Sequence, residues 1–269
     1  MKNPTQYYKK VDEYFSEDAA DFEHRYRQNG ILQDLRKSFR SYISRLDFDT
    51  ALEIGFGPGL DLEYFANKFP MRKFYGVDIA KGMVDICEER LIREQIKNVQ
   101  IAHSNIENIS NCFPNVETYD VIYVFFGALN TVSDLNKVVK CLEILSHKET
   151  RLILTFVNKI YLAEIIIHLL RGRFSSALKR LNPVWGGYSP VKNLESRCYS
   201  FKDIKNAFGE YFCIEEKRGY SILSPPWFRS GLKQKLGSVY NLLFKLDEAL
   251  SKTVCWQLGE YSLYTMKKS

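Results

Sequence analysis

One stretch of the sequence decides the fold: Leu52-Glu53-Ile54-Gly55-Phe56-Gly57-Pro58-Gly59. Apolar residues that suit a strand precede three glycines at alternate positions, and a helix-compatible segment, 60–68, follows at once. A strand that turns sharply into a helix leaves free backbone N–H groups at the helix N-terminus, where they can bind a polar or anionic ligand. Glycine tolerates positive φ and, without a Cβ, lets a ligand lie against the backbone. The stretch therefore predicts a strand–loop–helix unit that binds a ligand at its loop.

The spacing of the glycines distinguishes this loop from the common dinucleotide-binding loop. The dinucleotide fingerprint is G-x-G-x-x-G, whereas here the third glycine comes one residue early and Glu53 lies two residues before the first. The next apolar run, 73–77, ends in Asp78. A carboxylate at the tip of the second strand can accept hydrogen bonds from both hydroxyls of a ribose. The pattern favours a nucleoside site that needs no pyrophosphate, and it disfavours an NAD-dependent dehydrogenase.

These residues resemble the first motif of the class I S-adenosylmethionine-dependent methyltransferases, E/D-x-G-x-G-x-G followed by an acid at the end of the second strand. The resemblance covers about 50–158 and implies S-adenosylmethionine as the cofactor. It implies that Glu53 or the loop backbone meets the methionine ammonium group and that Asp78 binds the ribose. Members of the family often have an acid after the third strand that binds the adenine amino group; Asn105 stands there, and its side-chain carbonyl can accept the same bond.

The full set of cofactor contacts that the resemblance implies comes from the ends of the first four strands. It comprises Glu53, Gly55, Phe56, Gly57, Gly59, Asp78, Ile79, Met83, Asn105, Ile106 and Phe125. Within this set, Ile79 and Met83 are expected to pack on the adenine.

The rest of the chain alternates short β-rich runs with helical stretches. Strands are expected near 50–55, 73–78, 99–103, 119–126, 151–157, 211–222 and 261–267, and helices near 59–68, 81–95, 133–146 and 200–208. This alternation predicts an α/β fold with a parallel sheet and right-handed crossovers. The resemblance implies a Rossmann-like seven-stranded sheet in the order 3-2-1-4-5-7-6, with the last strand antiparallel.

Three segments lie outside the alternation. Residues 1–48 are expected to form an N-terminal helical cap, because apolar and aromatic positions recur at helical spacing on both sides of a break at Asn29-Gly30. Residues 49–269 are expected to form the methyltransferase domain, with insertions after strands 5 and 6 at about 159–200 and 223–260.

Length and composition predict a soluble globular protein. The chain has 269 residues, of which 45% are hydrophobic and 26% charged. Six scattered cysteines without a C-x-x-C pair indicate free thiols and a reducing, cytoplasmic setting. The first residues show no apolar stretch typical of a signal peptide, and no acidic cluster indicates a catalytic metal.

The net charge of +6 is concentrated in two segments. Five cations face only Glu164 between 159 and 182, and four cations face no acid between 223 and 246. In 159–181, apolar residues recur at helical spacing beside the cations. Such a segment can be a lid over a hydrophobic substrate, a solvated face packed on the sheet, or a peripheral contact with the inner surface of a membrane. The sequence leaves these three interpretations open.

The end of the fourth strand, 125–130, is where methyl transfer takes place in the family. The phenylalanines there indicate an apolar or aromatic acceptor pocket, and the motifs for methylating base amino groups or pyrimidine C5 are absent. We therefore predict methyl transfer to a small hydrophobic, lipid-like or natural-product acceptor at O, N or C, mainly by proximity and in-line orientation. A general base helps if the acceptor is a hydroxyl or an ammonium group. Spacing does not distinguish among the candidates, which are His168, Tyr188, Tyr14, Tyr26 and His24.

Two other functions are compatible with the sequence. The first is RNA methylation, with the basic insertions holding phosphates. The missing amino-base motifs and the lack of a separate RNA-binding module disfavour nucleic acid as the partner, but they do not argue against ribose or ring-nitrogen targets. The second is a non-catalytic nucleoside-binding or regulatory protein. An intact cofactor loop without acceptor turnover would distinguish it from an enzyme.

Overall fold

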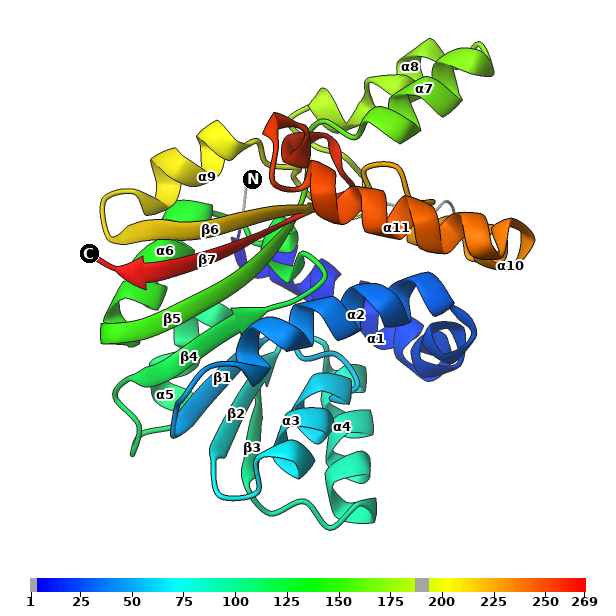
Figure 1. Cartoon of the computed structure of the whole chain (residues 1–269). Coiled ribbons are helices and arrows are strands. Elements are labelled where there is room, and N and C mark those ends of the chain that lie inside the picture. Colours follow the sequence, from blue (N-terminus) through cyan, green and yellow to red (C-terminus); the bar gives the residue numbers. More distant parts are fainter. Residues whose placement is uncertain (1–3, 187–193) are drawn as a thin grey trace.

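The computed structural model describes residues 4–186 and 194–269. In these ranges, seven strands form one sheet in the order β3-β2-β1-β4-β5-β7-β6 (Figure 1). The strands are β1 (Thr50–Ile54), β2 (Lys73–Asp78), β3 (Val99–His103), β4 (Tyr119–Val124), β5 (Ser146–Val157), β6 (Phe212–Tyr220) and β7 (Tyr261–Lys268). The first five are parallel, and β7 runs antiparallel to both β5 and β6. The predicted strand order and the antiparallel last strand are confirmed.

Helices cover both faces of the sheet. On one face lie α2 (Gly30–Ser44), α3 (Leu60–Lys68) and α4 (Lys81–Arg93); on the other lie α6 (Leu135–Ile144) and α9 (Phe201–Phe208). Successive residues of β1 pack into the two hydrophobic cores on opposite faces of the sheet, because side chains alternate across a strand. Ala51 packs with the α2–α4 core and Leu52 with the α6–α9 core. The β1 loop is thus held between two buried layers.

Strand β5 begins five residues earlier than expected. Its charged residues 147–149 were predicted to lie outside a strand, but Ser146 already pairs with Tyr119 of β4. The register then shifts before Val121 pairs with Arg151. The Thr150 hydroxyl donates to the Tyr119 carbonyl (2.6 Å), which holds the irregular segment to the sheet.

The N-terminal residues form two helices, α1 (Pro4–Gln28) and α2, which meet at the expected break. The Asn29 side chain accepts hydrogen bonds from the backbone N–H groups of Ile31 and Leu32 (3.2 Å each), so it caps α2. Helix α1 packs against α4 at the end of the sheet where the glycine loop lies.

The remaining helical elements are short. After β3 and β4 come η1 (Ile106–Asn108), α5 (Ile109–Cys112) and η2 (Ala128–Thr131); after β5 come α7 (Leu162–Leu170), α8 (Phe174–Ala177) and η3 (Lys179–Leu181); after β6 come η4 (Trp227–Arg229), α10 (Gly231–Leu236), α11 (Ser238–Leu250) and η5 (Val254–Leu258). Among the described residues, no helix combines the length and apolar character needed to cross a bilayer. Helices α7 and α8 project away from the sheet (Figure 1).

Candidate cofactor and acceptor site

A cavity of about 730 Å³ lies at the carboxyl ends of β1–β4. Its lining comes mainly from the loops after these strands and from α1, α2 and η4, with Tyr261 at the start of β7. Ligands of open α/β sheets bind at this edge because the loops after parallel strands converge there.

The glycine loop presents its backbone to this cavity at Gly57. The residue has φ +58°, its N–H donates to Asp78 Oδ2 (2.7 Å), and a Cβ at this position would meet no atom within 4 Å. Gly59 has another role, because a Cβ there would lie 2.3 Å from Cys87 Sγ. Gly57 thus leaves room for a ligand, whereas Gly59 allows α3 to approach α4 and does not line the cavity.

Asp78 joins the loops that follow β1 and β2. Besides the bond from Gly57, its Oδ1 accepts the N–H of Ala80 (2.8 Å). Burial raises the pKa of the Asp78 carboxyl to about 6, although these hydrogen bonds oppose the shift. Asp78 lines the cavity, so further lone pairs of the carboxylate are available to ligand hydroxyls.

A mostly apolar niche that includes the Asn105 side chain lies next to Asp78. It is lined by Ile79, Met83 and Ile106 together with Asn105. The Asn105 side-chain oxygen is buried and has no hydrogen-bond partner in the described part of the chain. An unpaired buried acceptor costs about 1–3 kcal/mol, and a ligand amino group placed here would satisfy it.

Glu53 and Phe56 lie behind the glycine loop and do not line the cavity. The Tyr123 hydroxyl hydrogen-bonds to Glu53 Oε2 (3.1 Å). Burial raises the pKa of Glu53 well above its usual range, and the nearby Asp61 carboxylate adds to the shift. Asp61 itself is ion-paired with Arg36 and, at 2.6 Å, with Arg40.

Helix α1 forms one side of the cavity. It is held there because two of its side chains cap the N-terminus of α4. Helix α4 starts after Ala80, which offers no side-chain cap. Two α1 side chains replace it: Asp12 accepts the Lys81 N–H (2.9 Å) and Ser16 accepts the Gly82 N–H (3.0 Å). This contact places the next turns of α1 along the cavity.

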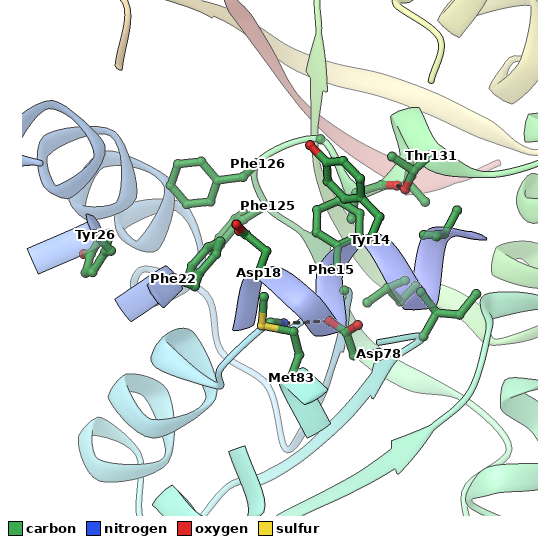
Figure 2. A pocket seen from close by; sticks show the side chains of 18 of the residues that line it. Tyr14, Phe15, Asp18, Phe22, Tyr26, Asp78, Met83, Phe125, Phe126 and Thr131 are labelled. Atoms are coloured by element: carbon green, nitrogen blue, oxygen red, sulfur yellow. Dashed lines mark hydrogen bonds between the residues drawn. The ribbon is translucent and has the colours of Figure 1, made fainter. Parts of the chain in front are cut away.

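The cavity beyond the niche is strongly aromatic. Its aromatic lining residues are Tyr8, Tyr14, Phe15, Phe22, Tyr26, Phe125, Phe126, Trp227, Phe228 and Tyr261. Figure 2 shows Asp78 and Met83 together on one side, with Phe22, Phe125 and Phe126 nearby. One cavity therefore contains both the nucleoside-type niche beside Asp78 and an aromatic half.

Phe126 stands at the turn after β4 in an unusual conformation. Its φ of +54° is in the left-handed region, which is costly for a residue with a large side chain. Its ring lies against the Arg36 guanidinium (4.6 Å), which is also over the Tyr26 ring (4.7 Å). The stacked cation and the rings hold this side of the cavity in place.

The candidate bases are widely separated in the structure. Tyr14 and Tyr26 line the cavity, whereas His24 is exposed on α1 and pairs with Gln28 (3.0 Å). His168 lies on α7 and is not part of the lining. Tyr188 falls outside the described residues.

Several lining residues were not among the predicted site residues. Phe15 and Phe22 share one face of α1 with Tyr14 and Tyr26, so their helical spacing could have revealed them. Trp227 lies far along the chain in an insertion, and no local pattern connects it to the glycine loop.

Comparison with known proteins agrees with this geometry. Residues 51–146 match the family model described as a methyltransferase domain, and they include the strands and loops that form the nucleoside-type niche. This segment is similar to the methyltransferase-domain family. S-adenosylmethionine is the cofactor of that family.

Individual relatives match the methyltransferase segment only in part. A demethylmenaquinone methyltransferase from Geobacillus sp. is 35% identical over 71 residues, which are 26% of this chain and 29% of that protein. A tRNA (guanine-N(7)-)-methyltransferase from Serratia proteamaculans is 30% identical over 81 residues, 30% of this chain and 34% of that protein. The chain thus spans about a third of the length of these curated relatives.

Solved structures share the methyltransferase fold over most of the chain. An S-adenosylmethionine-dependent methyltransferase from Clostridium acetobutylicum aligns with a TM-score of 0.57, covering 92% of this chain and 98% of that one at 16% identity. At this identity the likeness establishes the fold alone.

The residues of the cavity fit the family's cofactor. Asp78 can accept ribose hydroxyls, the unpaired Asn105 oxygen can accept an adenine amino group, and the open space at Gly57 can take a ligand close to the backbone.

Proposed function

We propose that this protein transfers a methyl group from S-adenosylmethionine to a small acceptor with an apolar or aromatic body. The observation that supports this proposal is that one cavity includes both the Asp78–Asn105 niche and the aromatic residues of α1, η4 and the end of β4. A volume of about 730 Å³ falls in the usual range for small-molecule sites. Cofactor and acceptor can therefore share one enclosure.

The residues of the cavity can promote the reaction chiefly by binding and orientation. S-adenosylmethionine supplies a methyl group that is already electrophilic, on a sulfonium. The aromatic side chains would hold an apolar acceptor and exclude water, and such positioning can remove several kcal/mol from a barrier. If the acceptor atom carries a proton, Tyr14 and Tyr26 are the candidate bases that line the cavity.

Calorimetric titration with S-adenosylhomocysteine tests the cofactor half of the proposal. We expect binding to the wild type, no binding of NADH, and at least about tenfold weaker binding by Asp78→Ala, the scale of a lost hydrogen bond to a charged group. Absence of S-adenosylhomocysteine binding to the wild type would refute the proposed cofactor site.

Transfer of radiolabelled methyl from S-adenosylmethionine tests the acceptor half. Phenols, quinols, hydrophobic acids and prenylated compounds form the panel. Phe22→Ala, in the lining, should raise KM for a true acceptor, whereas Phe174→Ala, on exposed α8, should not. Cofactor binding without transfer to any small molecule would favour the non-catalytic alternative.

RNA is the competing acceptor. One relative is named a tRNA methyltransferase, so RNA is tested in the same methyl-transfer assay. The cations Arg171, Arg173 and Lys179 of the first basic insertion do not line the cavity. Methyl transfer to RNA whose binding weakens steeply with salt would overturn the small-molecule proposal.

A further inference from the structure

The helices that follow β5 expose far more apolar surface than is usual for helices so rich in apolar residues. Helix α7 has the sequence Leu-Ala-Glu-Ile-Ile-Ile-His-Leu-Leu, and none of its residues is buried. A helix this apolar is ordinarily buried in a protein core or in lipid. Leu162, Ile166, Leu169 and Leu170 are exposed at i, i+4, i+7 and i+8, so they form one stripe along the helix.

The exposed apolar surface continues beyond α7. Phe174 of α8 is 67% exposed, Leu170 at the end of α7 is 82% exposed, and Leu178 and Leu181 are exposed as well. Helices α7 and α8 pack against each other and project together from the body (Figure 1). We call the exposed side chains of Leu162, Ile166, Leu169, Leu170, Phe174, Leu178 and Leu181 the apolar patch.

A buried arginine fixes this arrangement. Arg180, 6% exposed, is ion-paired with Glu164 of α7 and lies 4.0 Å from the Glu260 carboxylate. Its guanidinium also lies over the rings of Tyr161 (5.0 Å) and Trp185 (4.8 Å). Because these contacts hold the base of the helices to the body, the exposure of the apolar patch is a feature of the fold.

The charges around the apolar patch have one sign. Glu164 is the only acid between 159 and 182, and Arg180 neutralises it. Arg171, Arg173 and Lys179 form no ion pair within the described residues. The projecting element therefore presents exposed leucine, isoleucine and phenylalanine side chains beside three unneutralised cations.

From this combination we propose that α7, α8 and η3 dock on an anionic lipid bilayer. The apolar side chains would enter the boundary between headgroups and acyl chains, and the cations would meet the acidic headgroups, as interfacial amphipathic helices do. A projecting apolar element needs a matching pocket in a protein partner but no fixed shape in lipid. With nine residues, α7 is too short to cross a bilayer, so the contact is peripheral.

The experiment is flotation of the full-length protein with vesicles. One arm contains phosphatidylglycerol mixed with phosphatidylcholine, and the neutral arm contains phosphatidylcholine alone. We expect the wild type to float with the anionic vesicles and much less with the neutral ones. Raising the salt should weaken the binding without abolishing it, because the apolar contribution is not screened.

Three double variants with the same change in net charge separate the contributions. Leu170→Glu with Phe174→Glu removes apolar contacts, Arg171→Gln with Arg173→Gln removes cations, and Met71→Glu with Ile92→Glu is the control. Met71 and Ile92 are also highly exposed, and Figure 1 places α4, which carries Ile92, at the opposite end of the molecule. The first two variants should bind about tenfold or more weakly, and the control should bind as the wild type does.

The outcomes of the vesicle experiment can be distinguished from a failure of the proposed methyl-transfer function. Circular dichroism and S-adenosylhomocysteine titration should be unchanged in all three variants, because every substituted side chain is outside the cavity. Lack of flotation by the wild type, or equal loss in the control, would overturn the proposal. Concentration-dependent dimers in light scattering that disappear in the Leu170/Phe174 variant, without vesicle binding, would assign the apolar patch to self-association instead.

Discussion

The ionisation of the Asp78 carboxyl should control the affinity of the site for S-adenosylhomocysteine. Its pKa is raised to about 6 by burial, while acceptance of ribose hydroxyls needs the carboxylate form. Below the pKa, binding must first remove a proton, so we expect the affinity for S-adenosylhomocysteine to fall about tenfold per pH unit on acidification below 6 and to be level above it. Calorimetric titration across this range measures the effect. Asp78→Asn should bind weakly with no such dependence, and a flat wild-type profile would contradict the assignment.

Substitution of Asn105 should affect the affinity for S-adenosylhomocysteine and the thermal stability of the protein differently. Replacing it with leucine removes the acceptor that we assign to the adenine amino group, so the affinity for S-adenosylhomocysteine should fall by about 1–3 kcal/mol. The free protein loses only an unpaired buried oxygen, so its thermal stability should be unchanged or higher. Asn105→Asp, which keeps an acceptor, is the control and should retain binding. Parallel loss of stability and affinity in Asn105→Leu would instead indicate a structural role.

At the scale of elements, the cap that α1 provides for α4 should control access to the cavity. We expect Asp12→Ala with Ser16→Ala to free the first amides of α4, each cap contributing about 1 kcal/mol. Hydrogen exchange should then quicken in α1 but not in the strands, and S-adenosylhomocysteine should bind at least about fivefold more weakly. Glu13→Ala, between the two substituted positions and exposed, is the matched control. Unaltered exchange in α1 would show that other contacts hold the helix.

Local patterns predicted most elements because their causes are local. The apolar run of β1, the helix break at Asn29 and the acid at the end of β2 are all visible in adjacent residues. The cap of α4 could not be predicted, because its donors and acceptors are separated by 66 or 69 positions in the chain. The same limit applies to Glu53, whose position two residues before the glycine loop does not reveal that its carboxyl is enclosed by Tyr123 and Asp61.

At the scale of the whole molecule, the two halves of the cavity differ in how far they could be predicted. The niche around Asp78 and Asn105 follows from strand ends that any parallel sheet brings together, and the family resemblance supplied the order of the strands. The aromatic half joins α1 to η4, which contains Trp227 and Phe228. This meeting of the N-terminal helix with a late insertion depends on the packing of the complete chain. The sequence could therefore predict a small hydrophobic acceptor but not the elements that enclose it.

Because both ends of the chain enclose the cavity, ligand binding should stabilise the entire molecule. A ligand that binds only the folded state at about 100 times its Kd adds about 2.7 kcal/mol to the free energy of unfolding. For a chain of this size each kcal/mol raises Tm by about 2–4 °C, so S-adenosylhomocysteine should raise Tm by about 5–10 °C in scanning calorimetry. NADH should produce no shift, and Asp78→Ala should show little at the same ligand concentration. If the Tm of the wild type did not shift at saturation, either the ligand would bind the folded and unfolded chains equally well or it would not bind the folded protein. The second explanation would exclude the cavity as a cofactor site.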